Sequence, residues 1–271
     1  MAGDIPDTRE RPDRLRIYYA DIPEGIQLHL GWYGRGSKDP KTAFIDLIAK
    51  IIPLRKNKHM TILDAGSGYG IPAIYLAKKY PLLDVFGIDV LEQHVVAAND
   101  AAKESRVEAR VRFKTGSYLH TGFEAGKFDA IFLLESSCHT SEKRQLLEEM
   151  HRILKPGGCL VFFEYVLKRL GSRISTLEYE IIKEGLCIME FLDESVWELA
   201  KEVGLTMDTF VDVTPAVEFG IKKNCRWAAN KLGNDAKGCR AHQLALVCVK
   251  NLCDANELFY GIVKMKKDRA P

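Results

Sequence analysis

The chain has 271 residues, 46% of them hydrophobic and 28% charged, which is typical of a globular protein with a buried core and not of a disordered one. Lys and Arg total 39 against 37 Asp and Glu, so a net charge of +2 gives no broad field that would attract nucleic acid or an anionic membrane. Residues 1–16 are polar and charged, and no run of about 18 apolar residues occurs. We therefore expect no secretion signal, no membrane span and a cytoplasmic location.

The seven cysteines are scattered along the chain and include no C-x-x-C pair. This spacing lacks the paired ligands of a zinc site, so we expect reduced thiols and no bound metal.

From about Thr61 onward, short apolar runs alternate with helical patterns, which predicts a parallel sheet with right-handed crossover helices. The predicted strands are 61–64, 84–89, 110–114, 128–134 and 159–166. The predicted helices are 72–80, 92–105 and 141–154, whereas 115–127 shows no clear helical pattern. Lys155-Pro156-Gly157-Gly158 is expected to end the third helix and turn into the fifth strand.

After residue 166 the alternation is looser. The stretch 178–204 looks mostly helical, 206–213 is a predicted strand, and 214–230 is either another helix or a lid. The closing strand is either 257–265 or 244–249, and periodicity does not separate the two. The pattern as a whole predicts an α/β, doubly wound fold.

A glycine-rich turn, Leu63-Asp64-Ala65-Gly66-Ser67-Gly68-Tyr69-Gly70, lies between the first predicted strand and helix. Its first two glycines let the backbone turn tightly and approach a ligand, and its last lies where helix amides can meet an anionic group. Ile71 breaks the G-x-G-x-x-G/A dinucleotide pattern. The acid before the glycines, Asp64, can instead accept from an ammonium group, which suits an amino-acid tail.

Asp89 ends the second predicted strand, where an acid can bind both hydroxyls of a ribose. The alternative is that Asp89 caps the following helix. Because ligands of open α/β sheets bind at the carboxyl ends of the strands, the glycine turn and Asp89 together indicate a nucleoside ligand.

The turn Asp64–Gly70, then Asp89, then Phe128-Asp129, then Leu154-Lys155-Pro156-Gly157-Gly158 resemble the successive motifs of class I S-adenosylmethionine-dependent methyltransferases. The resemblance implies S-adenosylmethionine as cofactor. It also implies a Rossmann-like, mostly parallel sheet of seven strands with helices on both faces, an N-terminal cap and a helical lid insertion. We expect one domain over 1–271, divided into a cap (1–59), a cofactor-binding core (60–166) and the lid with the rest of the sheet (167–271).

The resemblance also implies which residues hold the cofactor. Asp64 and the glycine turn would bind the methionine part and Asp89 the ribose, Val90 would flank the adenine, and the loop Gly116-Ser117-Tyr118 would hold the adenine edge. Family members often carry an acid where Ser117 stands, although a hydroxyl can also accept or donate one bond. The full expected set is Tyr19, Asp64, Gly66, Ser67, Gly68, Gly70, Asp89, Val90, Ser117, Tyr118 and Leu134.

Two further segments resemble the sterol, tocopherol and small-molecule branch of the family. Tyr18-Tyr19 and His29-Leu30-Gly31-Trp32-Tyr33 are similar to its N-terminal cap, at a shorter spacing, although an ordinary amphipathic segment is the alternative. Glu135 and His139 match an E-x-x-x-H run that faces the transferred methyl group in that branch. Otherwise Glu135 binds backbone amides and His139 caps the next helix.

The roof of the expected pocket comes from residues after 166. We expect Trp32 and Phe219 to contact substrate, and the run 186–192 either suits a lipophilic ligand or is plain core. With an N or O acceptor, His139 would remove the proton; with an alkene carbon, Glu135 and aromatic faces would stabilise a cation.

The resulting hypothesis is methyl transfer to a small, lipophilic acceptor such as a prenyl, terpenoid or sterol-like molecule, with carbon as one option for the accepting atom. The alternatives are an N- or O-methyltransferase of an alkaloid or amine, and a non-catalytic S-adenosylmethionine-binding interaction protein. The sequence has no basic tail and no Asn/Asp-Pro-Pro-Tyr/Phe motif, which argues against a nucleic-acid substrate. It also has no Asp…Asp-Asn set, which argues against a metal-dependent reaction. The sequence identifies neither the acceptor nor the oligomeric state.

Overall fold

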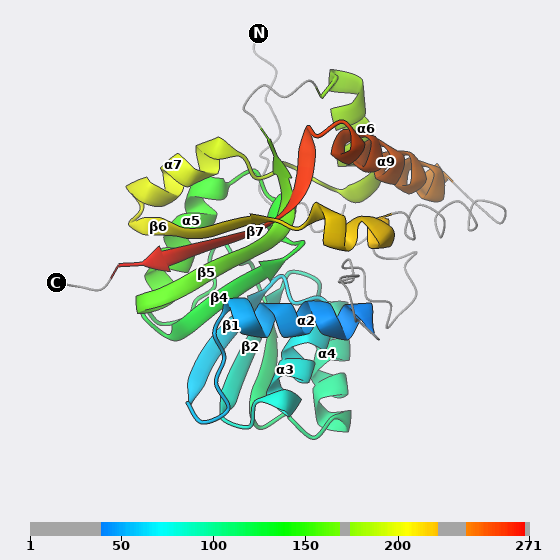
Figure 1. The fold of residues 1–271 in the computed structure, drawn as a ribbon. Coiled ribbons are helices and arrows are strands. Elements are labelled where there is room, and N and C mark those ends of the chain that lie inside the picture. Colours follow the sequence, from blue (N-terminus) through cyan, green and yellow to red (C-terminus); the bar gives the residue numbers. More distant parts are fainter. Residues whose placement is uncertain (1–38, 169–173, 222–236, 269–271) are drawn as a thin grey trace, which may run out of the picture.

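The computed structural model of the chain describes residues 39–168, 174–221 and 237–268. Its centre is one seven-stranded sheet in the order β3-β2-β1-β4-β5-β7-β6 (Figure 1). The first five strands are parallel, and β7 runs antiparallel to both β5 and β6. The strands are β1 (Met60–Ala65), β2 (Leu83–Asp89), β3 (Val111–Thr115), β4 (Phe128–Leu134), β5 (Leu154–Leu167), β6 (Leu205–Asp212) and β7 (Leu258–Lys267).

Helices cover both faces of the sheet. They are α2 (Pro40–Ile51), α3 (Ile71–Lys79), α4 (Glu92–Glu104), α5 (Lys143–Ile153), α6 (Thr176–Leu186), α7 (Glu194–Glu202) and α9 (Lys237–Asp254), with a short 3-10 helix η1 (Ser137–His139) and a helical stretch at 214–221. Alternate strand residues face opposite cores. Phe132 and Phe163 pack with α2, α3 and α4, whereas Ile131 and Phe162 pack with α5 and α7. The predicted seven-stranded, mostly parallel α/β fold is confirmed.

The start of β5 differs from the prediction. The run 155–158, expected to be a turn ahead of the strand, lies inside β5, which begins at Leu154. Phe128 pairs with Leu154 and Ala130 with Cys159, so the run is accommodated as an irregularity in the ladder, with Gly157 at φ +78°. Glycine adopts this left-handed conformation without a Cβ clash, and the chain bulges without leaving the sheet.

The structure decides between the open alternatives near the end of the chain. The closing strand is β7, while 244–249 lies within α9. The stretch 178–204 contains most of α6 and all of α7, which are separated by residues 187–193. Cys187 caps the end of α6 in a left-handed conformation with φ +53°. Of the segment 214–230, residues 214–221 are helical and the rest lies outside the described residues.

Three chemical features of the described part bear on function. The cysteines whose side chains are described are free thiols: Cys138, Cys159, Cys187, Cys248 and Cys253. The described residues hold no group of three or more His, Cys, Asp or Glu side chains able to bind a metal ion. No helix among them combines the length and apolarity that crossing a membrane requires.

Candidate active site

The glycine turn, Asp89 and the Glu135–His139 run meet at one edge of the sheet, because β1, β2 and β4 are neighbouring parallel strands and all end there. The turn is tied to the end of β2, since the amides of Gly66 and Ser67 both donate to the carbonyl of Ile88, at 2.8 and 3.1 Å. The predicted cofactor residues of the core therefore lie around a common edge.

The three glycines of the turn have left-handed φ values but different tasks. A Cβ at Gly66 would lie 2.4 Å from Cβ of Ser136, and one at Gly70 would lie 2.3 Å from the Phe113 ring. At Gly68 a Cβ would have no atom of the described residues within 4 Å. Packing therefore requires glycine at the first and last positions, whereas open space at Gly68 leaves the backbone accessible to a ligand.

Asp89 braces the glycine turn. Its Oδ2 accepts from the Gly68 amide at 2.8 Å and its Oδ1 from the Leu91 amide at 2.9 Å, with Nδ1 of His94 3.4 Å from Oδ1. The cap of α4 is Leu91, which has no side-chain cap bond, so Asp89 does not have the alternative role of capping this helix. A carboxylate has about four acceptor positions, so two remain to accept the hydroxyls of a ribose.

Asp64 is a buried acid at this edge with an unsatisfied oxygen. The residue is 2% exposed, and its Oδ2 has no hydrogen-bond partner among the described residues. Burial, together with the negative charge of Asp89, raises the pKa of Asp64 well above its usual range. A ligand ammonium group would supply both the missing partner and the missing charge. The residues present therefore fit the amino-acid tail of S-adenosylmethionine.

The loop after β3 carries the expected adenine contacts. Oγ of Ser117 accepts from the Leu119 amide at 3.0 Å, which shapes the turn, and the buried Tyr118 hydroxyl donates to the Ser136 carbonyl at 3.1 Å. Tyr118 thus links this loop to the end of β4. Val90 and Leu134 are half-buried at the same edge. Adenine binding by Val90, Ser117 and Tyr118, and cofactor binding by Leu134, stay predictions.

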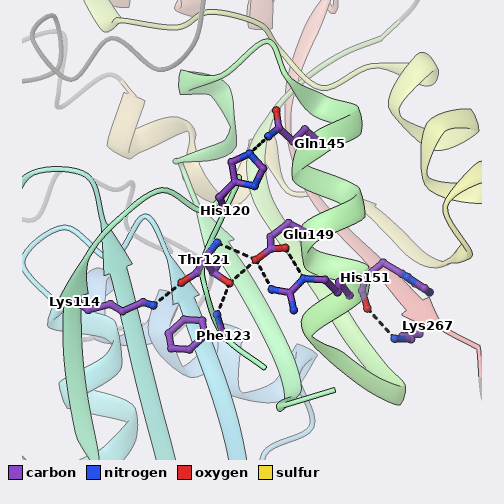
Figure 2. A network of polar contacts seen from close by, with 9 residues as sticks. Lys114, His120, Thr121, Phe123, Gln145, Glu149, His151 and Lys267 are labelled. Atoms are coloured by element: carbon purple, nitrogen blue, oxygen red, sulfur yellow. Dashed lines mark hydrogen bonds and ion pairs between the residues drawn. The ribbon is translucent and has the colours of Figure 1, made fainter. Parts of the chain in front are cut away.

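A polar network anchors the loop after β3, where the sequence shows no helical pattern, to α5 (Figure 2). The buried carboxylate of Glu149 accepts from the amide and the hydroxyl of Thr121, at 2.8 and 2.5 Å, and from Arg152 at 2.7 and 2.8 Å. Lys114 donates to the Thr121 carbonyl. Because the bonds of Thr121 are to charged groups, they hold the irregular loop in one place.

Glu135 follows β4 in a strained position. Its φ is +50°, its amide donates to the Phe163 carbonyl at 2.9 Å, and Oε1 accepts from the Tyr260 hydroxyl at 2.8 Å. The Tyr260 ring is fully buried and packs edge-on against Tyr165 and Phe44, with centroids 5.2 and 6.1 Å away. A non-glycine residue in this region costs free energy that the surrounding contacts must offset, which is common at functional sites.

His139 ends η1, one turn after Glu135. Nδ1 donates to the Cys187 carbonyl at 3.0 Å, which places the lone pair of the neutral ring on Nε2. Burial lowers the pKa of His139 below its usual value, although the Cys187 carbonyl and Asp89 act in the opposite direction. At neutral pH the ring is therefore uncharged and able to accept a proton.

Three expected site residues remain: Tyr19, Trp32 and Phe219. Tyr19 and Trp32 lie outside the described residues. Phe219, on the helical stretch 214–221, is 55% exposed, and its contact with a substrate stays a prediction.

Sequence reasoning missed Ser136, whose Oγ donates to the Ala65 carbonyl at 2.6 Å, as well as Tyr260 and Glu164. Only Glu164 carries a sequence signal, because it interrupts the apolar run of β5.

Comparisons with known proteins show which enzymes this chain is similar to. Residues 63–162 match the sequence family described as a methyltransferase domain. The 27-O-demethylrifamycin SV methyltransferase of Amycolatopsis mediterranei is 29% identical over 204 residues, which cover 72% of this chain and 74% of that protein. Norajmaline N-methyltransferase of Rauvolfia serpentina is 26% identical over 226 residues, covering 75% and 76%. Sterol 24-C-methyltransferase of Debaryomyces hansenii is 28% identical over 111 residues, covering 41% and 29%.

Solved structures share the fold. Geranyl diphosphate C-methyltransferase from Streptomyces coelicolor, in complex with Mg²⁺, geranyl diphosphate and S-adenosyl-L-homocysteine, has a TM-score of 0.75 at 17% identity, covering 97% of this chain and 99% of that one. The cyclase SpnF has a TM-score of 0.75 at 23% identity, covering 96% and 93%. The fold therefore serves more than one reaction, and the chemistry must be argued from the site.

Proposed function

The chain belongs to the class I S-adenosylmethionine-dependent methyltransferases, and from that premise we propose that it methylates a small, lipophilic acceptor beside Glu135 and His139. When bound, S-adenosylmethionine supplies a methyl group on a positively charged sulfur, which is released as a neutral thioether. Asp64, the backbone at Gly68, and Asp89 would hold its methionine and ribose parts. The chain's remaining task is to orient the acceptor, exclude water and receive a proton.

The surroundings of Glu135 and His139 support a lipophilic acceptor. Tyr260, which binds Glu135, belongs to an apolar cluster that also includes Ile188 and Phe191 from the segment after α6. The helical stretch 214–221 adds Val217 and Ile221 to the same cluster. A polar pair at the border of such a cluster matches a ligand that is mostly apolar and has one reacting atom.

The observation that carries the proposal is the state of His139. A neutral imidazole that donates from Nδ1 to a carbonyl has its lone pair on Nε2, the atom that can take up a proton, and methylation of an O–H or N–H acceptor releases one. Methylation of an alkene carbon followed by loss of a neighbouring proton also needs such a base. The relatives act, by their names, at oxygen, nitrogen and carbon, so the role of His139 is common to these routes.

Glu135 distinguishes the second candidate, transfer to carbon. An alkene attacked in this way becomes a cation, and a carboxylate fixed by the Tyr260 hydroxyl would stabilise it. With an oxygen or nitrogen acceptor no carbocation forms, so the Glu135 charge contributes less.

The test is incubation of the protein with methyl-labelled S-adenosylmethionine and lipid-phase and aqueous metabolite extracts, followed by identification of the labelled product. We expect label in an apolar product, and we expect His139→Asn to lower kcat by about 10²- to 10⁴-fold. Glu135→Gln should lower kcat comparably only if the product is methylated at carbon. Label confined to water-soluble products would contradict the lipophilic acceptor, and an unchanged kcat of His139→Asn at saturating acceptor would exclude the base role.

A further inference from the structure

A lysine is buried behind the active-site turn. Lys143, at the start of α5, is 4% exposed, and its ammonium donates to the carbonyls of Ser137, Thr140 and Glu190, at 2.6, 2.8 and 3.1 Å. An ammonium has three protons, so these three oxygens use its full donor capacity. Burying a charged lysine costs free energy, which the hydrogen bonds to the three main-chain carbonyls offset.

The three carbonyls belong to two segments that are far apart in the sequence. Ser137 and Thr140 flank His139 in the turn after β4, and Glu190 lies in residues 187–190, which we call the roof segment. The roof segment is bonded to the same turn at other points. The amides of Met189 and Glu190 donate to the Cys138 carbonyl, at 2.7 and 3.2 Å. The turn and the roof segment therefore form one hydrogen-bonded unit, with Lys143 at its centre.

The same turn is bound on its other side by an acid. Oε2 of the buried Glu164 accepts from the Ser137 hydroxyl and the Cys138 amide, each at 3.2 Å. A cation thus holds the carbonyls of the turn and an anion holds its amide and hydroxyl. Both charges match the polarity of the groups they bind, so the turn is fixed from two sides.

We propose that Lys143 is a positioning residue that orients His139 for proton transfer by joining the turn after β4 to the roof segment. The ring of His139 takes its direction from the Cys187 carbonyl, which belongs to the roof segment. Without Lys143, the roof segment keeps its amide bonds to the Cys138 carbonyl but loses its bond to α5, so the Cys187 carbonyl is held less firmly. This role rests on the proposed function only in that His139 receives the proton.

The charge of Lys143 has a second, measurable effect on His139. Burial is the main cause of the lowered pKa of His139, and the Lys143 charge lowers it further, against the raising effects of the Cys187 carbonyl and Asp89. Lys143 itself is surrounded by Cys138, Glu164, Glu190 and Asp193, and burial lowers its own pKa. Removing the Lys143 charge raises the pKa of His139, whereas releasing the Cys187 carbonyl lowers it, so Lys143→Met should shift the acidic limb of the kcat profile, and the direction shows which effect is larger.

The experiment compares Lys143→Met with wild type and with Lys267→Met. Lys267 is a matched control, because it donates to the carbonyls of His151 and Leu154, at 2.8 and 3.0 Å, at the opposite end of α5. We expect Lys143→Met to lower kcat by about tenfold to a hundredfold, with little change in the Kd for S-adenosylmethionine. The pKa of His139, followed by NMR and assigned with His139→Asn, should shift in Lys143→Met and stay unchanged in Lys267→Met.

The outcomes separate this inference from the proposed function. An unchanged His139 pKa together with an unchanged kcat in Lys143→Met would overturn the positioning role. A shifted His139 pKa with wild-type kcat would support the contact and contradict His139 as the base. If Lys143→Met does not fold, Lys143→Gln, which is also neutral but keeps two donor protons, is measured by the same two readouts with the same expected and contrary results.

Discussion

At the scale of single residues, Asp64 shows how a binding group can oppose stability. Its carboxylate is buried at the end of β1, and one oxygen has no partner in the described part of the chain. The pKa of Asp64 is raised by burial and by Asp89, so the folded protein favours the protonated form. For a group whose pKa is raised on folding, the stabilising contribution is present at low pH and is lost as the pH rises through the folded pKa. At neutral pH, which lies above the ordinary pKa of an aspartate, the buried carboxyl group therefore weakens the unliganded protein.

Asp64→Asn should consequently raise the melting temperature of the unliganded protein by about 2 °C or more, the shift expected for about 1 kcal/mol. The same substitution should weaken S-adenosylmethionine binding roughly 10- to 100-fold, since a hydrogen bond to a charged group contributes about 1.5–3 kcal/mol. Thermal unfolding and calorimetric titration check the two effects. As a further check, wild-type affinity should fall as the pH drops through the raised pKa, whereas the affinity of the variant should not. A variant that is less stable and binds normally would contradict the assignment of Asp64.

At the scale of elements, the phenyl ring of Phe113 on β3 shapes the cofactor turn from below. A Cβ at Gly70 would lie 2.3 Å from this ring, and one at Gly87 on β2 would lie 2.1 Å from it. The ring thus occupies the space that side chains would take at both positions. The close approach of β2, β3 and the turn before α3 depends on two glycines that are far apart in the sequence.

Gly87→Ala should lower the free energy of unfolding by about 1–3 kcal/mol, the usual cost of overpacking a core. The double variant with Phe113→Leu should be less destabilised than the sum of the single changes, because the smaller side chain makes room. Urea denaturation measures both. Gly126→Ala is the control, since φ is +65° there and a Cβ would have nothing within 4 Å, so its cost is backbone strain alone. Additive costs in the double variant would exclude a clash with Phe113.

Local sequence patterns predict individual elements but not the contacts between residues that are far apart in the sequence. The bounds of β4 are those predicted, since an apolar strand between two turns is visible in the sequence alone. The glycine turn and Asp89 were predicted because their spacing along adjacent strands carries the signal. The Tyr260–Glu135 bond and the Lys143–Glu190 contact were not, because they join residues 125 and 47 positions apart. Nothing near Tyr260 in the sequence distinguishes it from an ordinary buried tyrosine.

At the scale of the whole molecule, the position of β7 joins the two parts of the sheet. This strand pairs with β5 over residues 258–266 on one side and with β6 on the other. It also carries Tyr260, whose hydroxyl binds Glu135. The sheet is therefore continuous only when its last strand along the chain is in place.

Deletion of residues 256–271 should abolish the single cooperative unfolding transition, because β5 would lose a partner along most of its length and β6 its strand neighbour. Circular dichroism during urea denaturation measures this. Deletion of 269–271, which lies after β7, is the control and should leave the transition unchanged. A cooperative transition of wild-type midpoint in the longer deletion would show that the five parallel strands fold independently of β7.

The late arrival of β7 has a consequence during synthesis on the ribosome. Residues 168–257 separate β5 from β7, so one edge of the largely apolar β5 stays unpaired while this stretch is translated. At about 5–20 residues per second, the interval lasts about 5 to 18 s. An exposed apolar strand edge is a template for pairing with other chains. The nascent protein is thus a candidate for chaperone binding in that window, and slower translation of this stretch should increase aggregation.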